Sequence, residues 1–264
     1  MASCRRGIVT AEADRASGVG QERVVGMKHA VVTGGAKGIG LGVVRELTRE
    51  GWHCDILDAD PVGRSIADDL GGAFVQADVT RPDELGRAFA DLAERFGPIH
   101  GLVNSAGINR TGPSDQLPVT DWQRVIDIDL SGTFYSCQAA YPHMAPGSAI
   151  VNLASVLAVR ALPGRVAYTA AKFGVVGITR VLAVEWASRS IRVNAVGPSW
   201  TDTPLIRDQL AGGTLDLEVL DRVPMGRLAQ VEDVVGAIAF LLSDKASFIT
   251  GQTLYVDGGY TWAG

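Results

Sequence analysis

Short apolar runs alternate along this chain with longer segments in which apolar residues recur at helical spacing. The runs are rich in valine, isoleucine and leucine, and they lie at His29–Val32, Cys54–Leu57, Ala73–Gln76, Ile99–Val103, Ala149–Leu153, Ile191–Val196 and Thr253–Val256. One helical pattern follows the first run and ends near Gly51, and others occupy Pro82–Phe96, Trp122–Met144, Tyr168–Ser188 and Val231–Leu242. Apolar strands that alternate with helices predict a parallel sheet covered on both faces. We therefore expect an α/β fold with a doubly wound (Rossmann-like), mostly parallel seven-stranded sheet.

The domain organisation follows from a change in composition near residue 27. Residues 1–26 are rich in Ala, Gly, Arg and Glu and lack the apolar segment of a secretory signal. We expect a flexible extension there and a single domain over residues 27–264. Within that domain, Leu205–Val223 is loop-like, with Gly212 and Gly213 in its middle. This segment is either a mobile lid over a substrate or a plain surface insertion.

Charge and cysteine usage narrow the classes of function. The net charge is −5 over 264 residues, which argues against a nucleic-acid partner because phosphate binding needs a basic face. No stretch approaches the ~20 apolar residues of a membrane span. Cys54 and Cys137 lie in apolar segments, and this usage is typical of a reducing cytoplasm. The four histidines are scattered, so we expect no metal site.

A glycine-rich turn, TGGAKGIG (33–40), joins the first strand to its helix. Glycines let the backbone approach a pyrophosphate at a helix N-terminus, although a plain tight turn would also use them. Asp58 ends the next strand and could bond both ribose hydroxyls of an adenosine while repelling a 2′-phosphate. Lys37 opposes this preference, because a cation in the turn could bind that phosphate. Together these residues favour NAD over NADP.

Polar residues also end the third and fourth strands. Asp78 and Val79 could flank an adenine ring, and the small residues from Asn104 to Gly107 could pack against a cofactor. A helix cap at Asp78 and a turn at Asn104 are the ordinary alternatives.

Tyr168 and Lys172 stand four residues apart in a helical segment, so their side chains share one face, and Ser155 follows the fifth strand. A tyrosine with a pKa of about 10 is a poor acid or base at neutral pH. An adjacent ammonium stabilises the phenolate and lowers that pKa. With Ser155 holding the substrate oxygen, Tyr168 could exchange a proton while a hydride moves to or from a nicotinamide. An ordinary surface pair would explain the Tyr–Lys spacing taken alone.

The ordered motifs resemble the short-chain dehydrogenase/reductase family, of the single-domain type, over Lys28–Gly258. The matching segments are TGGAKGIG (33–40), Asp58, ADV (77–79), NSAG (104–107), Ser155, YTAAK (168–172), VNAVGP (193–198) and the C-terminal region. The resemblance implies that Tyr168 is the acid/base, that Lys172 lowers its pKa and binds the nicotinamide ribose, and that Ser155 orients the substrate oxygen.

The motifs and the resemblance together predict the contacts of the cofactor and the substrate. The cofactor contacts would be Gly34, Lys37, Gly38, Ile39, Gly40, Asp58, Asp78, Val79, Asn104, Ala106, Gly107, Tyr168, Lys172, Pro198, Thr201 and Thr203, with Thr203 reaching the carboxamide. The expected substrate contacts are Asn109, Leu157 and Trp200.

Three positions depart from the family's usual pattern. Ser105 and Ser199 stand where an asparagine and a glycine are usual, and we expect small effects from both. Asp129 stands where the family has a helix asparagine that is counted as a fourth catalytic residue. An ionised aspartate only accepts hydrogen bonds, whereas asparagine also donates. Asp129 therefore either serves through its main chain or alters the proton relay, and its charge could shift the titration near Lys172.

The sequence thus predicts an oxidoreductase that transfers a hydride between NAD(H) and a secondary alcohol or ketone of polyol, sugar, hydroxysteroid or 3-oxoacyl type. One alternative is an NADPH-dependent reductase of 3-oxoacyl thioesters, against which Asp58 argues. Another is a non-catalytic NAD-binding sensor, which would not need Ser155, Tyr168 and Lys172 together. We expect a small-molecule substrate, a cytoplasmic location, and a homodimer or homotetramer formed through DGGYTWAG (257–264) and the helix around Trp122–Met144.

Overall fold

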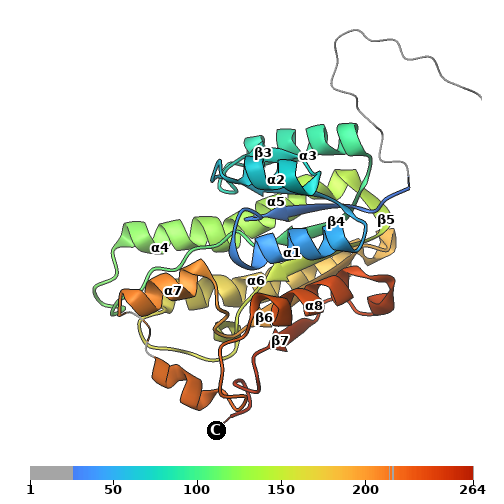
Figure 1. Ribbon diagram of the computed structural model, residues 1–264. Coiled ribbons are helices and arrows are strands. Elements are labelled where there is room, and N and C mark those ends of the chain that lie inside the picture. The colour runs from blue at the N-terminus through green and yellow to red at the C-terminus, as the bar shows by residue number, and fades with distance from the viewer. Residues whose placement is uncertain (1–25, 214, 216, 264) are drawn as a thin grey trace, which may run out of the picture.

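The computed structural model describes residues 26–213, 215 and 217–263. The extension predicted over residues 1–26 lies outside the described residues, apart from Gly26. All of the described helices and strands lie between His29 and Val256, and they pack together as one unit (Figure 1).

The described strands form one sheet in which every neighbouring pair is parallel, in the order β3-β2-β1-β4-β5-β6-β7. Their bounds are β1 (His29–Thr33), β2 (His53–Asp58), β3 (Phe74–Gln76), β4 (Ile99–Asn104), β5 (Met144–Leu153), β6 (Arg192–Pro198) and β7 (Thr253–Val256). The chain runs outward in one direction from β1 to β3 and in the other from β4 to β7. The predicted doubly wound α/β fold is confirmed, and its topological switch lies between β1 and β4.

Helices cover both faces of the sheet because strand residues alternate between two apolar cores. On β1, Ala30 and Val32 belong to the core under α1 and α8, whereas Val31 belongs to the core under α3, α5 and α6. The described α-helices are α1 (Gly38–Arg49), α2 (Gly63–Leu70), α3 (Pro82–Phe96), α4 (Val119–Val125), α5 (Gly132–Ala140), α6 (Val166–Trp186), α7 (Pro204–Ala211) and α8 (Val231–Leu242). Burial on both faces explains why the strands are apolar along most of their length.

The long helix predicted over Trp122–Met144 is divided in the structure. A π-helical turn at Ile126–Ser131 separates α4 from α5. Pro142 lies in a short 3₁₀ turn after α5, since proline cannot continue the helical hydrogen-bond ladder, and Met144 already begins β5. In α4, Trp122 is 36% exposed, whereas Val125 is fully buried.

The segment predicted as a loop at Leu205–Val223 is partly helical. α7 begins at Pro204, where the fixed φ of proline suits the first position of a helix, and it ends just before Gly212. A 3₁₀ turn follows at Leu217–Arg222. The polar and apolar residues of this segment are therefore arranged on a short helix rather than an open loop.

α6 and the turn after it, Val166–Arg189, form one helix that is long and apolar enough by composition to cross a membrane. No such stretch was expected from the sequence. In the fold this helix packs against β6 and the π-helical turn, and nine of its residues are buried, the first being Ala167 and the last Trp186. A core helix passes the same test of length and composition, so the segment is weak evidence for a membrane.

Candidate active site

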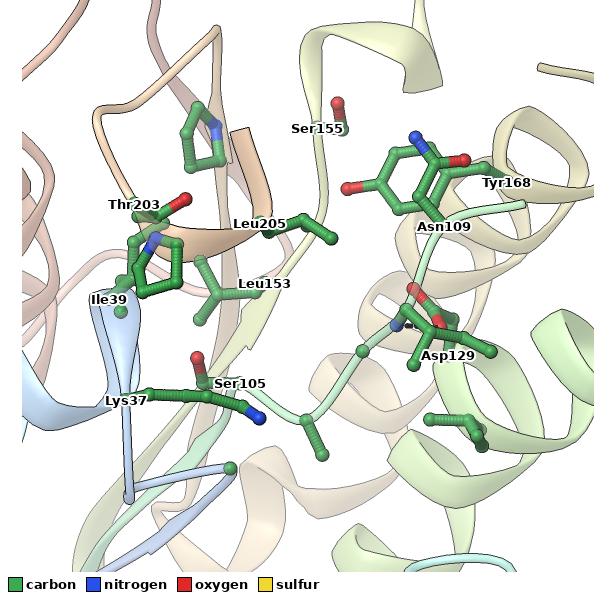
Figure 2. Close-up of a pocket in the computed structure, with 18 of the residues that line it drawn as sticks. Lys37, Ile39, Ser105, Asn109, Asp129, Leu153, Ser155, Tyr168, Thr203 and Leu205 are labelled. Carbon is green, nitrogen blue, oxygen red and sulfur yellow. Dashed lines mark hydrogen bonds between the residues drawn. The ribbon is translucent and has the colours of Figure 1, made fainter. Parts of the chain in front are cut away.

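A cavity of about 600 Å³ lies along the carboxyl ends of the strands, beside the switch between β1 and β4. Figure 2 shows Lys37 and Ile39 on one side of it and Ser155, Tyr168 and Asn109 on the other. All of the predicted site residues line this cavity except Gly40 and Asn104. The parallel sheet has therefore brought together residues that are far apart in the sequence.

The glycines of the turn lie so close to other backbone atoms that a side chain would not fit. Gly34 has a φ of +67°, and a Cβ there would lie 2.6 Å from the backbone nitrogen of Ala106. A Cβ on Gly40 would lie 2.2 Å from the carbonyl oxygen of Gly34. Gly40 thus shapes the turn without lining the cavity. Because α1 begins at Gly38 with no side-chain cap, its first N–H groups are available to an anion such as a pyrophosphate.

Asn104 is turned away from the cavity and is 3% exposed. Its Nδ2 donates to Oδ1 of Asn152 at 2.8 Å and contacts Sγ of Cys137 at 3.2 Å. The side chain therefore ties β4 to β5 below the sheet edge, and the cavity wall is formed by the residues after it, Ser105 and Ala106.

Acidic groups dominate the end of the cavity next to β2. The Asp58 carboxylate accepts hydrogen bonds from the backbone N–H groups of Ala36, at 3.0 Å, and Asp60, at 2.9 Å. Lys37 points to the same region, and its Nζ lies 3.7 Å from a carboxylate oxygen of Asp60. The cation that could have favoured a 2′-phosphate is thus paired with a carboxylate.

The residues predicted to contact the adenine and those predicted to contact the nicotinamide come from different elements. Asp78 accepts hydrogen bonds from the N–H and the hydroxyl of Thr80, each at 2.9 Å, so it also stabilises the turn before α3. At the opposite end, Pro198 ends β6, and Thr203 lies just before α7. A Cβ on Gly38 would lie 3.6 Å from Thr203, so α7 begins directly above the glycine turn.

Tyr168 lies in the first turn of α6, and its hydroxyl projects into the cavity beside Ser155 (Figure 2). Burial raises the pKa of Tyr168, and the charge of Asp129 acts in the same direction. Lys172 lowers the pKa, and a hydrogen bond with Ser155 and the charge of Arg165 add to that effect. The lysine therefore acts on Tyr168 as the sequence analysis expects, but in this structure burial outweighs it.

Lys172 is nearly completely buried and is held by three neighbours. Its Nζ donates to the carbonyl oxygen of Leu153 at 2.9 Å and lies 3.2 Å from Oδ2 of Asp129. The same Nζ is 5.3 Å from the centroid of the Tyr168 ring. Burial alone would lower the pKa of Lys172, but the charge of Asp129, followed by that of Tyr168, raises it overall.

Sequence reasoning missed several residues of the cavity. Leu205, Ile206 and Gln209 of α7 form part of its wall, as does Asp60 beyond β2. A helical reading of Pro204–Ala211 would have placed the first three, since proline at a first helical position is a recognisable signal. Asp60 carries no comparable signal, because its contact with Lys37 depends on how the two turns approach each other.

Comparisons with known proteins agree with this geometry. Residues 34–261 match the family model described as enoyl-(acyl carrier protein) reductase. The chain is 44% identical over 242 residues to cis-4-hydroxycyclohexanecarboxylate dehydrogenase of Sinomonas cyclohexanicum, which covers 88% of this chain and 96% of that protein. It is 40% identical over 242 residues to D-threitol dehydrogenase of Mycolicibacterium smegmatis, with 89% and 93% covered. The solved structure of ElxO with NADP bound has a TM-score of 0.83 and 30% identity, over 89% of this chain and 98% of that one.

The glycine turn provides a direct test of the cofactor cradle. Gly40→Ala forces its Cβ against Gly34, so we expect dinucleotide affinity to fall more than about tenfold, as measured by titration of NADH fluorescence. Gly86→Ala is the matched control, because Gly86 lies exposed within α3 with no atom within 4 Å of the added Cβ. This control should raise the free energy of unfolding by about 0.5–1 kcal/mol without changing affinity. Unchanged affinity in Gly40→Ala would mean that the turn does not hold the dinucleotide.

Proposed function

Because the chain belongs to the short-chain dehydrogenase/reductase family, we propose that it is an NAD(H)-dependent dehydrogenase of secondary alcohols in which Tyr168 exchanges the proton with the substrate. Family membership makes the chain an oxidoreductase. The observation that carries the proposal is the position of Tyr168 in the same cavity as the glycine turn, next to Lys172 and Ser155. A non-catalytic sensor would need the turn but not this proton-transfer set.

Each of these residues would have a distinct role in the reaction. A bound nicotinamide supplies hydride transfer at the substrate carbon. Ser155 would donate a hydrogen bond to the substrate oxygen and hold it beside Tyr168. The Tyr168 oxygen would accept the hydroxyl proton during oxidation and return it during reduction. Lys172 would stabilise the phenolate that exists between these steps.

The charges next to β2 support NAD rather than NADP as the cofactor. A 2′-phosphate placed there would face the carboxylates of Asp58 and Asp60, and Lys37 is already paired with Asp60. The solved relative ElxO has NADP bound, so both cofactors are compared in the test below.

The central test is nicotinamide absorbance in the presence of secondary alcohols. We expect NAD⁺ to give a higher kcat/KM than NADP⁺, and Tyr168→Phe to lower kcat by about 10²–10⁴-fold, because it removes the general acid/base. The variant should still bind NADH. Normal turnover by Tyr168→Phe would refute the mechanism, preference for NADP⁺ would refute the cofactor assignment, and wild-type inactivity across alcohols and ketones would favour the sensor.

The walls beyond Tyr168 support a compact, apolar alcohol as substrate. Val156, Leu157 and Trp200 line this part of the cavity, and Leu205 and Ile206 of α7 complete it. These side chains offer apolar contact and no hydrogen bonds, and the neighbouring polar side chains of Asn109 and Gln209 could serve one or two hydroxyl groups but not the several of a polyol, the rest of which would be desolvated without compensation. We propose a ring-shaped secondary alcohol in preference to a linear polyol, with α7 acting as a lid.

A pair of substrates tests this specificity. We expect kcat/KM for cyclohexanol to exceed that for D-threitol. Trp200→Ala should lower the ratio of kcat/KM for cyclohexanol to kcat/KM for D-threitol roughly tenfold, because it removes an apolar contact that only the cyclohexanol ring makes. Trp200→Phe should retain most of the ratio. If wild-type enzyme prefers the polyol, or if Trp200→Ala lowers both values equally, the apolar wall does not select the substrate.

Two separate apolar surfaces support self-association. On α6, Phe173, Val181 and Val184 are each more than half exposed and share one side of the helix. Phe248 and Leu254 are exposed next to the edge strand β7. Two different twofold contacts generate a tetramer, and one generates a dimer. We therefore propose a homotetramer.

The two buried thiols, of Cys54 and Cys137, support a cytoplasmic location for the protein, because reduced cysteines are typical of that compartment.

Light scattering after size exclusion distinguishes these states. We expect wild-type protein to have four times the mass of the chain and Val184→Glu to have twice that mass, because a charge on α6 removes one of the two contacts. Ser65→Glu is the control, because it adds the same charge on the exposed side of α2, which packs on β2 and β3 at the opposite edge of the sheet from β7. A wild-type monomer at micromolar concentration would refute the proposed assembly.

A further inference from the structure

Asp129 is the most deeply buried charged group of the cavity, with 0% exposure. One of its carboxylate oxygens accepts a hydrogen bond, and the other forms an ion pair. Oδ1 accepts a hydrogen bond from the backbone N–H of Ile108 at 2.8 Å, and Oδ2 lies 3.2 Å from Nζ of Lys172. The side chain therefore joins the loop after β4 to the lysine of α6.

The local backbone is adapted to bring a carboxylate to this point. Asp129 lies within the π-helical turn Ile126–Ser131, which widens the helix between α4 and α5. The hydroxyl of Thr133 donates to the carbonyl oxygen of Asp129 at 2.8 Å. Gly107 leaves space for the carboxylate, because a Cβ there would lie 2.9 Å from Oδ2.

An amide of the same shape could keep only one of these two contacts. Its oxygen could still accept the N–H of Ile108, but its NH₂ group would then face the ammonium of Lys172, and two donors repel each other. The ion pair with Lys172 is thus a property of aspartate at this position rather than of the helix geometry.

The charged groups around this pair are few in the described part of the chain. Tyr168, Lys172 and Arg165 belong to α6 or immediately precede it, and Arg124 of α4 lines the same cavity. Burial raises the pKa of Asp129, and Lys172 and the N–H of Ile108 oppose that rise. Of these groups, Asp129 is the one whose negative charge acts on both Lys172 and Tyr168.

We propose that Asp129 is a positioning residue whose carboxylate fixes the Lys172 ammonium and sets the pH range over which Tyr168 exchanges its proton. This inference rests on the proposed function of Tyr168, but it concerns a role that a carboxamide cannot perform. Asp129 keeps Lys172 charged to high pH, and at the same time it disfavours the negative charge of a nearby phenolate.

The sign of the pH effect follows from these two actions. Alcohol oxidation needs the ionised form of Tyr168, so its rate rises with pH through the pKa of that residue. Removing the negative charge of Asp129 lowers the pKa of Tyr168, because Asp129 raises it. The same change lowers the pKa of Lys172, because burial is then no longer opposed by Asp129. Activity should consequently begin at lower pH and decline again at high pH as Lys172 loses its proton.

The experiment compares the pH profiles of kcat/KM for NAD⁺-dependent alcohol oxidation in wild type, Asp129→Asn and Asp127→Asn. We expect Asp129→Asn to move the rising limb down by roughly one pH unit and to introduce a falling limb on the alkaline side. Asp127→Asn removes the same charge from the same π-helical turn, where Asp127 bonds the side chain of Gln123 outside the cavity. Its profile should match that of wild type.

A second measurement works without turnover. Titration of tyrosinate absorbance in wild type, minus that of Tyr168→Phe, isolates Tyr168, and the same difference is taken in the Asp129→Asn background. We expect the midpoint of the Tyr168 titration to lie at lower pH in the Asp129→Asn background than in wild type. An unchanged midpoint together with an unchanged profile overturns the proposal, even if kcat is lower, because a purely structural role predicts that result. Wild-type inactivity would instead contradict the proposed function and would leave the titration to decide the role of Asp129.

Discussion

The site depends on keeping an ammonium charged where almost no water reaches it. Lys172 is 4% exposed, and burial of a lone cation would shift its pKa down until it lost its proton. The carbonyl of Leu153 and the carboxylate of Asp129 replace the lost hydration. Breaking a buried pair of this kind by removing one partner commonly costs about 3–5 kcal/mol, so the two residues constrain each other as well as the neighbouring Tyr168.

This constraint is met by elements that come from distant parts of the sequence. Leu153 ends β5, Lys172 lies on α6, and Asp129 lies on the π-helical turn. The parallel sheet places the carboxyl end of β5 beside the helix, and the wide turn directs the carboxylate inward. The fold therefore positions these charges, and the proton exchange proposed for Tyr168 depends on their balance.

The strand ends could be predicted from the sequence because parallel strands bring their carboxyl ends to one edge. That rule located Asp58, Asp78 and Ser155 at the cavity without any knowledge of contacts. It misplaced the side chain of Asn104, which also ends a strand but turns under the sheet toward Asn152. The position of a residue along its strand determines its place in the sheet. Which way its side chain turns depends on the residues that it contacts elsewhere in the fold.

Asp129 shows that the direction of a side chain is equally hard to predict for a residue on a helix. A regular helix over Trp122–Met144 gives no indication that one aspartate faces an ammonium, because the π-helical turn changes the residues that share a face. The sequence could identify the substitution and its possible effect on titration. The 3.2 Å contact with Lys172 required the three-dimensional arrangement.

The wall proposed to face the substrate has a separate support, so the proposed proton-transfer site could be combined with different substrates. Trp200 packs edge-on against Tyr260, with ring centroids 4.7 Å apart. Arg160 donates to the carbonyl oxygen of Tyr260 at 2.8 Å and stacks over its ring, so the C-terminal segment buttresses the wall. None of these contacts involves Lys172 or Asp129. Substitutions at Trp200 or on α7 can therefore change the shape of the wall while the charge balance at Tyr168 is preserved, and relatives named for a polyol and for a ring alcohol are consistent with that separation.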